Sequence, residues 1–256
     1  MRLPLVPHPA PIGQLIECFC SSFSFDNGLL VKKRFQLTKY YNWLIFSIVN
    51  PEIQSRVKLY ARGKLADVGC GEKPYKAMIA EYVKEHVGID HEFTLHDKSE
   101  IDLIGSAYDI PVSDETFDSL LCTYVLEHLE RPHLAVAEAN RVLKKGGYGI
   151  YTVPFFWHIH EAPRDFYRYT KYGLRYLFEN SGFDVVELKA VSGFFITFGQ
   201  EFAYFLNQFR GKQRVNPLYW LLPPLIVLVQ AIAYILGRFE KQEDFTIEYI
   251  IVVRKK

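Results

Sequence analysis

The chain has 256 residues, of which 49% are hydrophobic and 23% are charged, and its 30 basic and 29 acidic side chains leave a formal net charge of +1. These values are typical of a folded protein of one or two domains and exclude a disordered or low-complexity chain. The near-zero charge removes the polyelectrolyte argument for a nucleic-acid partner, and four cysteines are too few for a disulfide scaffold, so we expect an intracellular protein.

Residues 1–60 are predicted to form an N-terminal helical extension. The first 13 residues contain four prolines and no continuous apolar run, which argues against a signal peptide. Between residues 14 and 60 apolar residues recur at helical spacing, and Pro51 is expected to break the helix. Such a segment either packs on the following domain as a cap or closes over a ligand.

Residues 61–191 and 245–256 are predicted to form one domain in which apolar strands alternate with amphipathic helices. The expected strands are 64–68, 86–90, 101–108, 117–124, 148–153, 183–190 and 245–254. The expected helices are 75–85, 133–144 and 171–180. This order predicts an α/β fold, a doubly wound, Rossmann-like, mostly parallel sheet of seven strands with helices on both faces.

The strongest motif is the glycine loop after the first of these strands, in which Gly69 and Gly71 flank Cys70. A strand that enters a G-x-G turn before a helix lets the backbone approach a ligand closely, because no Cβ intervenes. Three carboxylates are expected near this loop, at the carboxyl ends of successive strands: Asp67, Asp90 and Asp109. Each also has a local explanation, since Asp67 could cap a helix, Asp90 could belong to a turn, and Asp109 could form an Asx-turn.

The residues around the loop favour one kind of ligand over another. A dinucleotide site would need a third glycine near Lys73 and Pro74, under the pyrophosphate. The carboxylate of Asp67 would repel phosphates and attract a cation. A ligand that carries an amino group and a sulfonium suits this field better.

At this point the chain resembles the class I S-adenosylmethionine-dependent methyltransferases, in particular the type 11 group that includes bacterial glycan-modifying enzymes. The resemblance rests on residues 67–71, 90, 109–111, 117–118, 125–129 and 143–147. It implies that S-adenosyl-L-methionine is the cofactor, with Asp67 near the ammonium, Asp90 on the ribose and Asp109 on the adenine amino group. The full set of cofactor residues that it implies is Asp67, Gly69, Cys70, Gly71, Asp90, His91, Asp109, Ile110, Thr123 and Tyr124.

Candidate residues for the methyl acceptor follow the fourth and fifth strands. Transfer to a hydroxyl usually profits from a general base or a metal, and His128, His158 and His160 are the candidate catalytic residues. We expect no metal, because the His158-x-His160-Glu161 pattern lacks a convincing further ligand. Side chains expected to bind the substrate are Trp157, Arg164, Tyr167 and Arg168. The histidines could instead pack locally, and the two arginines could pair with Glu161 and Asp165.

Residues 192–244 are predicted to form an apolar helical insertion before the last strand. No charged residue occurs from Val215 to Gly237, but Pro223-Pro224 is expected to interrupt the run, and the last strand must rejoin the sheet. We therefore expect a peripheral membrane contact through residues 192–237, with the basic turn of Arg210, Lys212 and Arg214 at anionic headgroups. The alternative is a helical subdomain that buries this surface internally or in a dimer.

These observations predict an enzyme of the cytoplasm, at the inner face of the membrane, that methylates a hydroxyl of a sugar or a lipid-linked glycan. A quinone- or lipid-directed methyltransferase is a second hypothesis in the same class. A third is a cofactor-binding scaffold at a membrane that performs no catalysis.

Overall fold

The computed structural model describes residues 23–26, 29–32, 37–94, 97–210 and 216–256. Contacts divide the chain into two compact units, Met1–Tyr40 and Tyr41–Lys256. In the first unit, strands β1 (Phe23–Asp26) and β2 (Leu29–Lys32) pair antiparallel. The helical prediction was wrong for these two segments, and its part over residues 14–22 lies outside the described residues.

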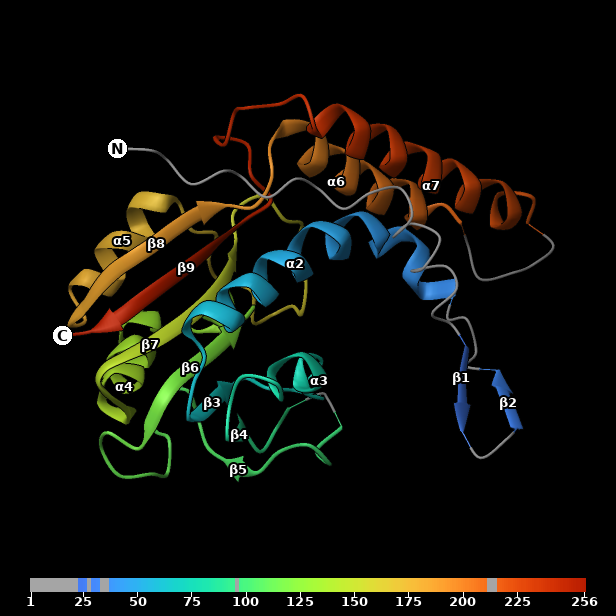
Figure 1. The fold of residues 1–256 in the computed structure, drawn as a ribbon. Coiled ribbons are helices and arrows are strands. Elements are labelled where there is room, and N and C mark those ends of the chain that lie inside the picture. The colour runs from blue at the N-terminus through green and yellow to red at the C-terminus, as the bar shows by residue number, and fades with distance from the viewer. Residues whose placement is uncertain (1–22, 27–28, 33–36, 95–96, 211–215) are drawn as a thin grey trace. The chain divides into compact units, whose positions relative to one another are not determined.

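The second unit is built on a seven-stranded sheet with the order β5-β4-β3-β6-β7-β9-β8 (Figure 1). Only β9 runs antiparallel to its neighbours β7 and β8, so the prediction of a mostly parallel, doubly wound sheet is confirmed. The strands are β3 (Lys64–Val68), β4 (Glu85–Asp90), β5 (Leu103–Ile104), β6 (Phe117–Thr123), β7 (Leu143–Pro154), β8 (Phe183–Ala190) and β9 (Glu248–Lys255). The chain order reverses between β3 and β6, and open α/β sheets bind ligands outside the carboxyl ends of strands at such a point.

Several predicted boundaries differ from the structure. The third strand is reduced to Leu103–Ile104, because β5 lies at the sheet edge and pairs only with β4. The helix expected at 75–85 is the single turn α3 (Lys76–Ile79). Strand β7 begins at Leu143, so Gly146 and Gly147 lie inside the strand rather than before it.

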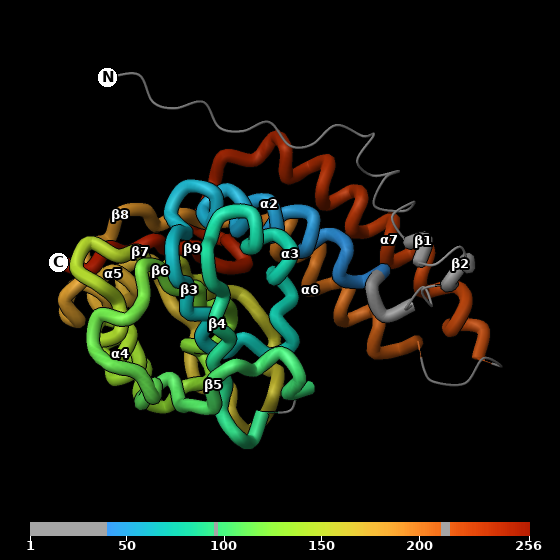
Figure 2. Tube along the Cα trace, turned by 60° about the horizontal axis from the view of Figure 1, so that its bottom comes forward, coloured from blue at the N-terminus to red at the C-terminus, as the bar shows by residue number. Residues whose placement is uncertain are grey.

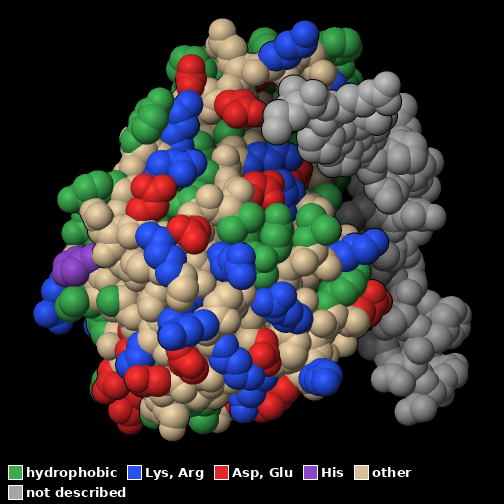
Figure 3. All heavy atoms as spheres, turned by 60° about the vertical axis from the view of Figure 1, so that its left-hand side comes forward, with side chains coloured by type: hydrophobic (Ala, Val, Ile, Leu, Met, Phe, Trp, Pro, Cys, Tyr) green, Lys and Arg blue, Asp and Glu red, His purple; other side chains and the backbone are tan. Residues whose placement is uncertain are grey.

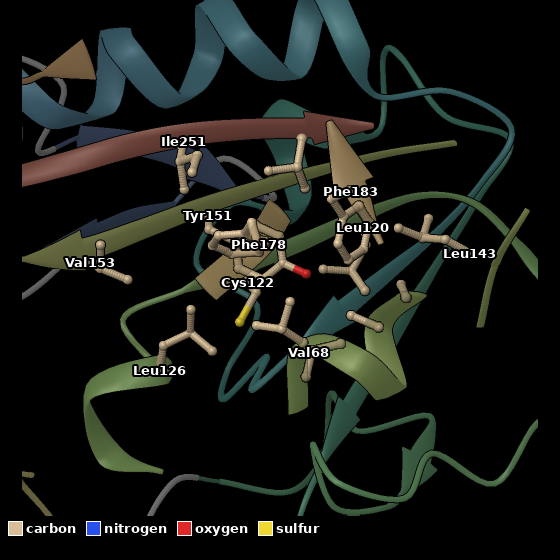
Figure 4. Packing of buried hydrophobic residues seen from close by; sticks show 14 of the residues in the cluster. Val68, Leu120, Cys122, Leu126, Leu143, Tyr151, Val153, Phe178, Phe183 and Ile251 are labelled. Carbon is tan, nitrogen blue, oxygen red and sulfur yellow. The ribbon is translucent and has the colours of Figure 1, made fainter. Parts of the chain in front are cut away.

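Each face of the sheet buries its own hydrophobic cluster, because successive strand residues point to opposite faces. One face packs on α4 (Pro132–Val142) and α5 (Lys171–Glu179), and there the rings of Tyr151 and Phe178 lie 4.7 Å apart (Figure 4). The other face packs on α2 (Trp43–Tyr60) through Ile150 and Ile250. Helices thus cover both faces of the sheet.

Helix α2 continues through Pro51, so the predicted break was wrong. Pro51 lies on the exposed side of the helix, whereas Val49, Ile53 and Val57 are buried against the sheet. Burial of these side chains outweighs the one backbone hydrogen bond that proline removes.

The apolar insertion forms two adjacent helices, α6 (Phe194–Gln208) and α7 (Leu218–Gly237), which pack on each other and on α2 (Figure 2). The predicted interruption at Pro223-Pro224 was wrong, because α7 contains both prolines. Pro223 cannot donate to the carbonyl of Tyr219, and Arg210 Nε lies 3.4 Å from that oxygen instead. Among the described residues, α7 is the one helix long and apolar enough to cross a membrane by length and composition, with a mean hydropathy of 2.0.

The surface of the α6–α7 pair differs from the rest of the molecule. Exposed large apolar side chains of this pair include Phe202, Phe205, Leu221, Leu228 and Ile235. The side of the molecule that lies to the left in Figure 1 instead mixes Lys and Arg with Asp and Glu (Figure 3). Half of the exposed large apolar side chains among the described residues lie on these two helices.

Candidate active site

The glycine loop lies at the carboxyl end of β3, where the backbone turns sharply. Gly69 and Gly71 have φ of 71° and 48°, a region that favours glycine, and the N–H groups of Gly69 and Cys70 donate to the Ile89 carbonyl at 2.8 and 3.2 Å. A Cβ at Gly69 would lie 2.3 Å from Cγ2 of Val125. The loops after β3 and β6 therefore touch, and position 69 leaves no room for a side chain.

Lys73 lies where a dinucleotide-binding loop would carry a third glycine. It adopts φ of 47°, the left-handed conformation that glycine would take. Its ammonium is buried and lies 2.5 Å from Asp102 Oδ2. The loop thus keeps a glycine-like turn, held by an ion pair.

Asp67 and Asp90 are both buried at this edge of the sheet. Asp90 accepts hydrogen bonds from the N–H of Gly71 at 2.9 Å and of His91 at 2.7 Å. Asp67 Oδ2 lies 2.9 Å from Nε2 of His86 on the neighbouring strand. Asp90 therefore orders the glycine loop directly, and Asp67 places a second carboxylate beside it.

The other predicted cofactor residues differ in exposure. Asp109 is exposed, whereas Ile110 is buried in the core and donates its N–H to Glu138 Oε1 at 2.7 Å. Thr123 is half-buried at the end of β6. Cys70 is buried, and desolvation raises the pKa of its thiol to about 12, so the sulfur remains protonated at neutral pH.

Tyr124 directly follows β6 with φ of 55°, and its hydroxyl donates to Glu248 Oε2 at 2.6 Å. Glu248 comes from the first residue of β9, and its other carboxylate oxygen meets no hydrogen-bond partner among the described residues. Burial raises the pKa of Glu248 to about 8, while the hydrogen bond from Tyr124 acts in the opposite direction. This pair ties the antiparallel strand to the end of β6.

Glu127 lies in the short 3-10 turn η2 (Leu126–His128) and is completely buried. Neither carboxylate oxygen meets a hydrogen-bond partner on another described residue. Desolvation raises the pKa of Glu127 to about 8, against the lowering influence of its own backbone N–H and of Arg168. Its backbone carbonyl accepts the N–H of Phe166 at 2.8 Å, which joins this turn to the loop after β7.

The three predicted histidines form two groups. The rings of His128 and His160 lie 4.7 Å apart, centre to centre. His158 stacks on Trp157 and faces α6, where its Nδ1 lies 3.3 Å from Glu201 Oε2. The structure therefore brings His128 and His160 together beside Glu127 and places His158 with the insertion.

The two arginines predicted to bind the substrate, Arg164 and Arg168, lie in the same loop but differ in their contacts. Arg168 makes two hydrogen bonds to Asp165, at 2.6 and 2.7 Å, and holds the pKa of that carboxyl far below its usual range. Arg168 also donates to the carbonyl groups of Trp157 and His158, so it organises the loop. Arg164 is exposed, and the hydroxyl of Tyr167 donates to the Glu130 carbonyl at 3.0 Å.

An open groove adjoins this loop along α6. It is lined by His158, Phe198, Glu201, Phe202, Tyr204, Phe205 and Gln208. Its walls are mainly aromatic, with Glu201 and His158 as the ionisable groups. The groove leads from the loop after β7 to the exposed apolar side chains of α6.

Sequence reasoning did not select Glu127 or Glu248 as site residues. Glu127 lies in the segment 125–129 that carries the family resemblance, and in that segment the sequence indicated only His128 as a catalytic candidate. Glu248 had one available signal, because it is an acidic residue directly before the apolar run 249–253. A buried carboxylate in such a position is often functional, since burial alone would select against it.

Comparisons with known proteins agree with the fold and the loop. Residues 66–151 match the family described as "Methyltransferase domain". An uncharacterized methyltransferase of Schizosaccharomyces pombe is 34% identical over 104 residues, which cover 33% of this chain and 37% of that protein.

Two solved structures share the fold at low sequence identity. Phosphoethanolamine N-methyltransferase 2 of Haemonchus contortus, in complex with S-adenosyl-L-methionine, has a TM-score of 0.53 and 16% identity over 90% of this chain and 61% of that chain. The 4+2 cyclase SpnF has a TM-score of 0.51 and 17% identity over 95% of this chain and 92% of that chain.

The sheet order and the glycine loop are those of the Rossmann-like methyltransferase fold, and the loop lies within the matched residues. The match to the methyltransferase-domain family extends over residues 66–151. The chain spans less than half the length of the curated relatives that it matches, 37% and 49%.

Proposed function

We propose that this protein transfers the methyl group of S-adenosyl-L-methionine to a hydroxyl of a sugar or a lipid-linked glycan at a membrane surface. The observation that carries the donor side is the buried pair Asp67 and Asp90 around the tight turn Gly69–Gly71. Two carboxylates at a closely approachable backbone suit a ligand with an ammonium, a sulfonium and ribose hydroxyls. Asp109, although exposed, keeps its proposed role toward the adenine amino group.

The reaction is an in-line displacement. The acceptor oxygen forms a bond to the methyl carbon as the carbon–sulfur bond breaks, so the sulfonium becomes a neutral thioether. The hydroxyl proton is transferred to a base. The candidates for this base are His128 in η2 and His160, whose ring lies beside it. The cofactor supplies the reactive carbon, and the protein aligns the two reactants.

The acceptor side is supported by the aromatic groove beside the same loop. Rings such as Tyr204 and Phe205 can pack on sugar faces or on lipid chains, and Glu201 with His158 can bind hydroxyl groups. The exposed apolar side chains of α6 and α7 extend from this groove. A lipid-linked acceptor would reach the site from a membrane without leaving the interface.

Two measurements test this proposal in sequence. Calorimetry with S-adenosylmethionine and S-adenosylhomocysteine measures donor binding, for which we expect saturable binding that Asp90→Asn weakens by about tenfold or more, the effect of a lost hydrogen bond to a buried group. Radiolabelled methyl transfer to extracted lipid-linked glycans, followed by mass analysis, then identifies the product.

The outcomes separate the hypotheses. A methylated sugar supports the proposal, and a methylated quinone or other lipid without sugar supports the lipid-directed enzyme instead. Cofactor binding without transfer to any acceptor would favour the scaffold. A folded protein that binds neither ligand would remove the methyl-transfer proposal.

A further inference from the structure

The fold brings Glu127, His128 and His160 together although they come from two loops. One ligand atom of each, a carboxylate oxygen or a ring nitrogen, lies within 4.8 Å of the others. The segment 125–128 follows β6, and His160 lies in the loop after the neighbouring strand β7. Of the sequence pattern His158-x-His160-Glu161, only His160 belongs to the cluster, and the fold adds Glu127 and His128 from the η2 turn.

The hydrogen bonds of the two imidazoles determine which nitrogen is available. His128 Nδ1 lies 2.6 Å from the Arg164 carbonyl, which can only accept, so Nδ1 carries the proton and Nε2 of the neutral ring carries the lone pair. His160 Nδ1 lies 3.4 Å from the carbonyl of His158 and 3.4 Å from Asp165 Oδ2, both acceptors. Histidines that bind metals commonly donate their second nitrogen to a carbonyl or a carboxylate in this way.

The lone pair on His128 Nε2 faces two carboxylates. Glu127 Oε1 lies 3.9 Å away and Glu161 Oε2 lies 3.7 Å away. Glu127 is 0% exposed, and both its oxygens are without a hydrogen-bond partner on another described residue. A buried carboxylate next to a nitrogen lone pair is unfavourable unless a proton or a cation lies between them.

We propose that Glu127, His128 and His160 bind a divalent transition-metal ion of the zinc type next to the methyl acceptor. Two imidazoles and one carboxylate are the donor set of catalytic zinc sites, in which the fourth position stays open for water or substrate. Metal bonds of about 2.0–2.2 Å require the three ligand atoms to move closer by about 1 Å, which side-chain rotations allow. Glu161, half-exposed at the rim, is placed to assist.

This site deepens the proposed function and rests on it for its chemical role. Val125 contacts Gly69, so the metal-binding turn adjoins the loop that would hold the methyl donor. An acceptor hydroxyl on the open position would lose its proton to solvent rather than to His128 or His160, whose lone pairs the ion would occupy, since the ion stabilises the alkoxide. The oxygen would then attack the methyl carbon as described above.

Metal binding is measured directly on the full chain, without any acceptor. The protein is stripped with a chelator, dialysed and titrated with Zn²⁺ by calorimetry, and with Co²⁺ by its visible absorption. We expect stoichiometric binding, with Glu127→Gln, His128→Gln and His160→Gln each weakening it at least about tenfold. The matched control is His158→Gln, which changes a histidine of the same loop outside the cluster and leaves the affinity unchanged.

Three results would overturn the metal site. They are no stoichiometric binding by the folded wild type, an equal loss in His158→Gln, and unchanged binding in all three ligand variants. Circular dichroism and S-adenosylmethionine binding check that each variant is folded. Methyl transfer that survives chelation would remove the metal and leave the proposed function, whereas metal binding without cofactor binding would do the reverse.

Discussion

Glu248 shows how burial changes the chemistry of one side chain at this site. It is enclosed between the sheet and Tyr124, and its pKa is raised from 4.5 to about 8. The folded protein therefore binds this proton more tightly than the unfolded chain does. Between about pH 4.5 and pH 8 the free energy of unfolding falls as pH rises, and the full cost of ionising Glu248 is present above that range.

Glu248→Gln tests this linkage. The substitution keeps the shape and removes the ionisation, so we expect equal stability with the wild type near pH 4 and a variant more stable by a few kcal/mol near pH 9, since a tenfold change in proton affinity corresponds to about 1.4 kcal/mol. Urea unfolding across this pH range measures the difference. Glu179→Gln, on the exposed side of α5, serves as the control and should show no comparable trend. A difference for Glu248→Gln that does not vary with pH would contradict the assignment.

Gly69 is a second position where one residue controls the site. Gly69→Ala adds a Cβ at positive φ and against Val125, so we expect a loss of about 1–3 kcal/mol in stability and a weaker affinity for S-adenosylmethionine. Thermal unfolding and calorimetry measure the two effects. Gly173→Ala is the matched control, because Gly173 lies in α5 with 3.4 Å to the nearest atom, and alanine should stabilise that helix by about 0.5–1 kcal/mol. Equal effects of both substitutions would refute the interpretation that the loop requires glycine at position 69.

At the scale of elements, α7 has two faces with different roles. Its buried residues Leu222, Ile226 and Ala233 face the protein, and Gln230 Oε1 accepts the N–H of Leu44 at 2.9 Å. The hydrogen bond ties the middle of α7 to the start of α2, which itself packs on the sheet. A helix held in this way presents its other face outward, as a surface-lying helix does, and we infer a peripheral membrane contact rather than a span.

Charges on the outer face of α7 should weaken the proposed membrane contact. We expect Leu225→Glu combined with Leu228→Glu to reduce co-sedimentation with anionic liposomes several-fold, because both side chains are exposed and would be placed in the lipid interface. Tyr172→Glu combined with Tyr176→Glu, on the exposed side of α5, is the matched control and should pellet as the wild type does. Equal pelleting of all three proteins would argue for the alternative, a dimer or an internal subdomain.

At the scale of the whole molecule, the site depends on segments far apart in the chain. The reversal of strand order between β3 and β6 brings the glycine loop and the η2 turn side by side, and β9 adds Glu248 from the end of the sequence. A ligand at this edge of the sheet would contact loops from several strands at once. Its binding should therefore stabilise the entire second unit.

Thermal unfolding with saturating ligand measures this coupling. At a ligand concentration of about 100 times Kd the stabilisation is about 2.7 kcal/mol, so we expect Tm to rise by about 5–10 °C with S-adenosylmethionine or S-adenosylhomocysteine. NAD at the same concentration is the control, because Asp67 disfavours a pyrophosphate. A larger rise with NAD would reverse the choice between the two cofactors.

The fold was predictable to a large extent because its signals are local. Alternating apolar strands and helices, with glycines after Val68, specify a doubly wound sheet whatever the details of the loops. The continuation of α2 through Pro51 and of α7 through Pro223 was not predictable, since packing on the sheet and on α6 outweighs the local cost of proline. The two-residue β5 likewise reflects its place at the sheet edge.

The sequence by itself determined the methyltransferase fold, the glycine loop and the placement of Asp67 and Asp90, because these follow from residue type and from position near the ends of β3 and β4. Only the tertiary structure decided that the ring of His160 lies beside His128 and not beside its sequence neighbour His158. It also decided that Glu127 is buried next to His128 and His160. Such juxtapositions depend on which loops meet at the edge of the sheet, and burial depends on residues from the whole chain. The pKa of an ionisable group depends on its burial and on the charges and hydrogen bonds around it. A local sequence pattern does not specify these, because they come from distant parts of the chain.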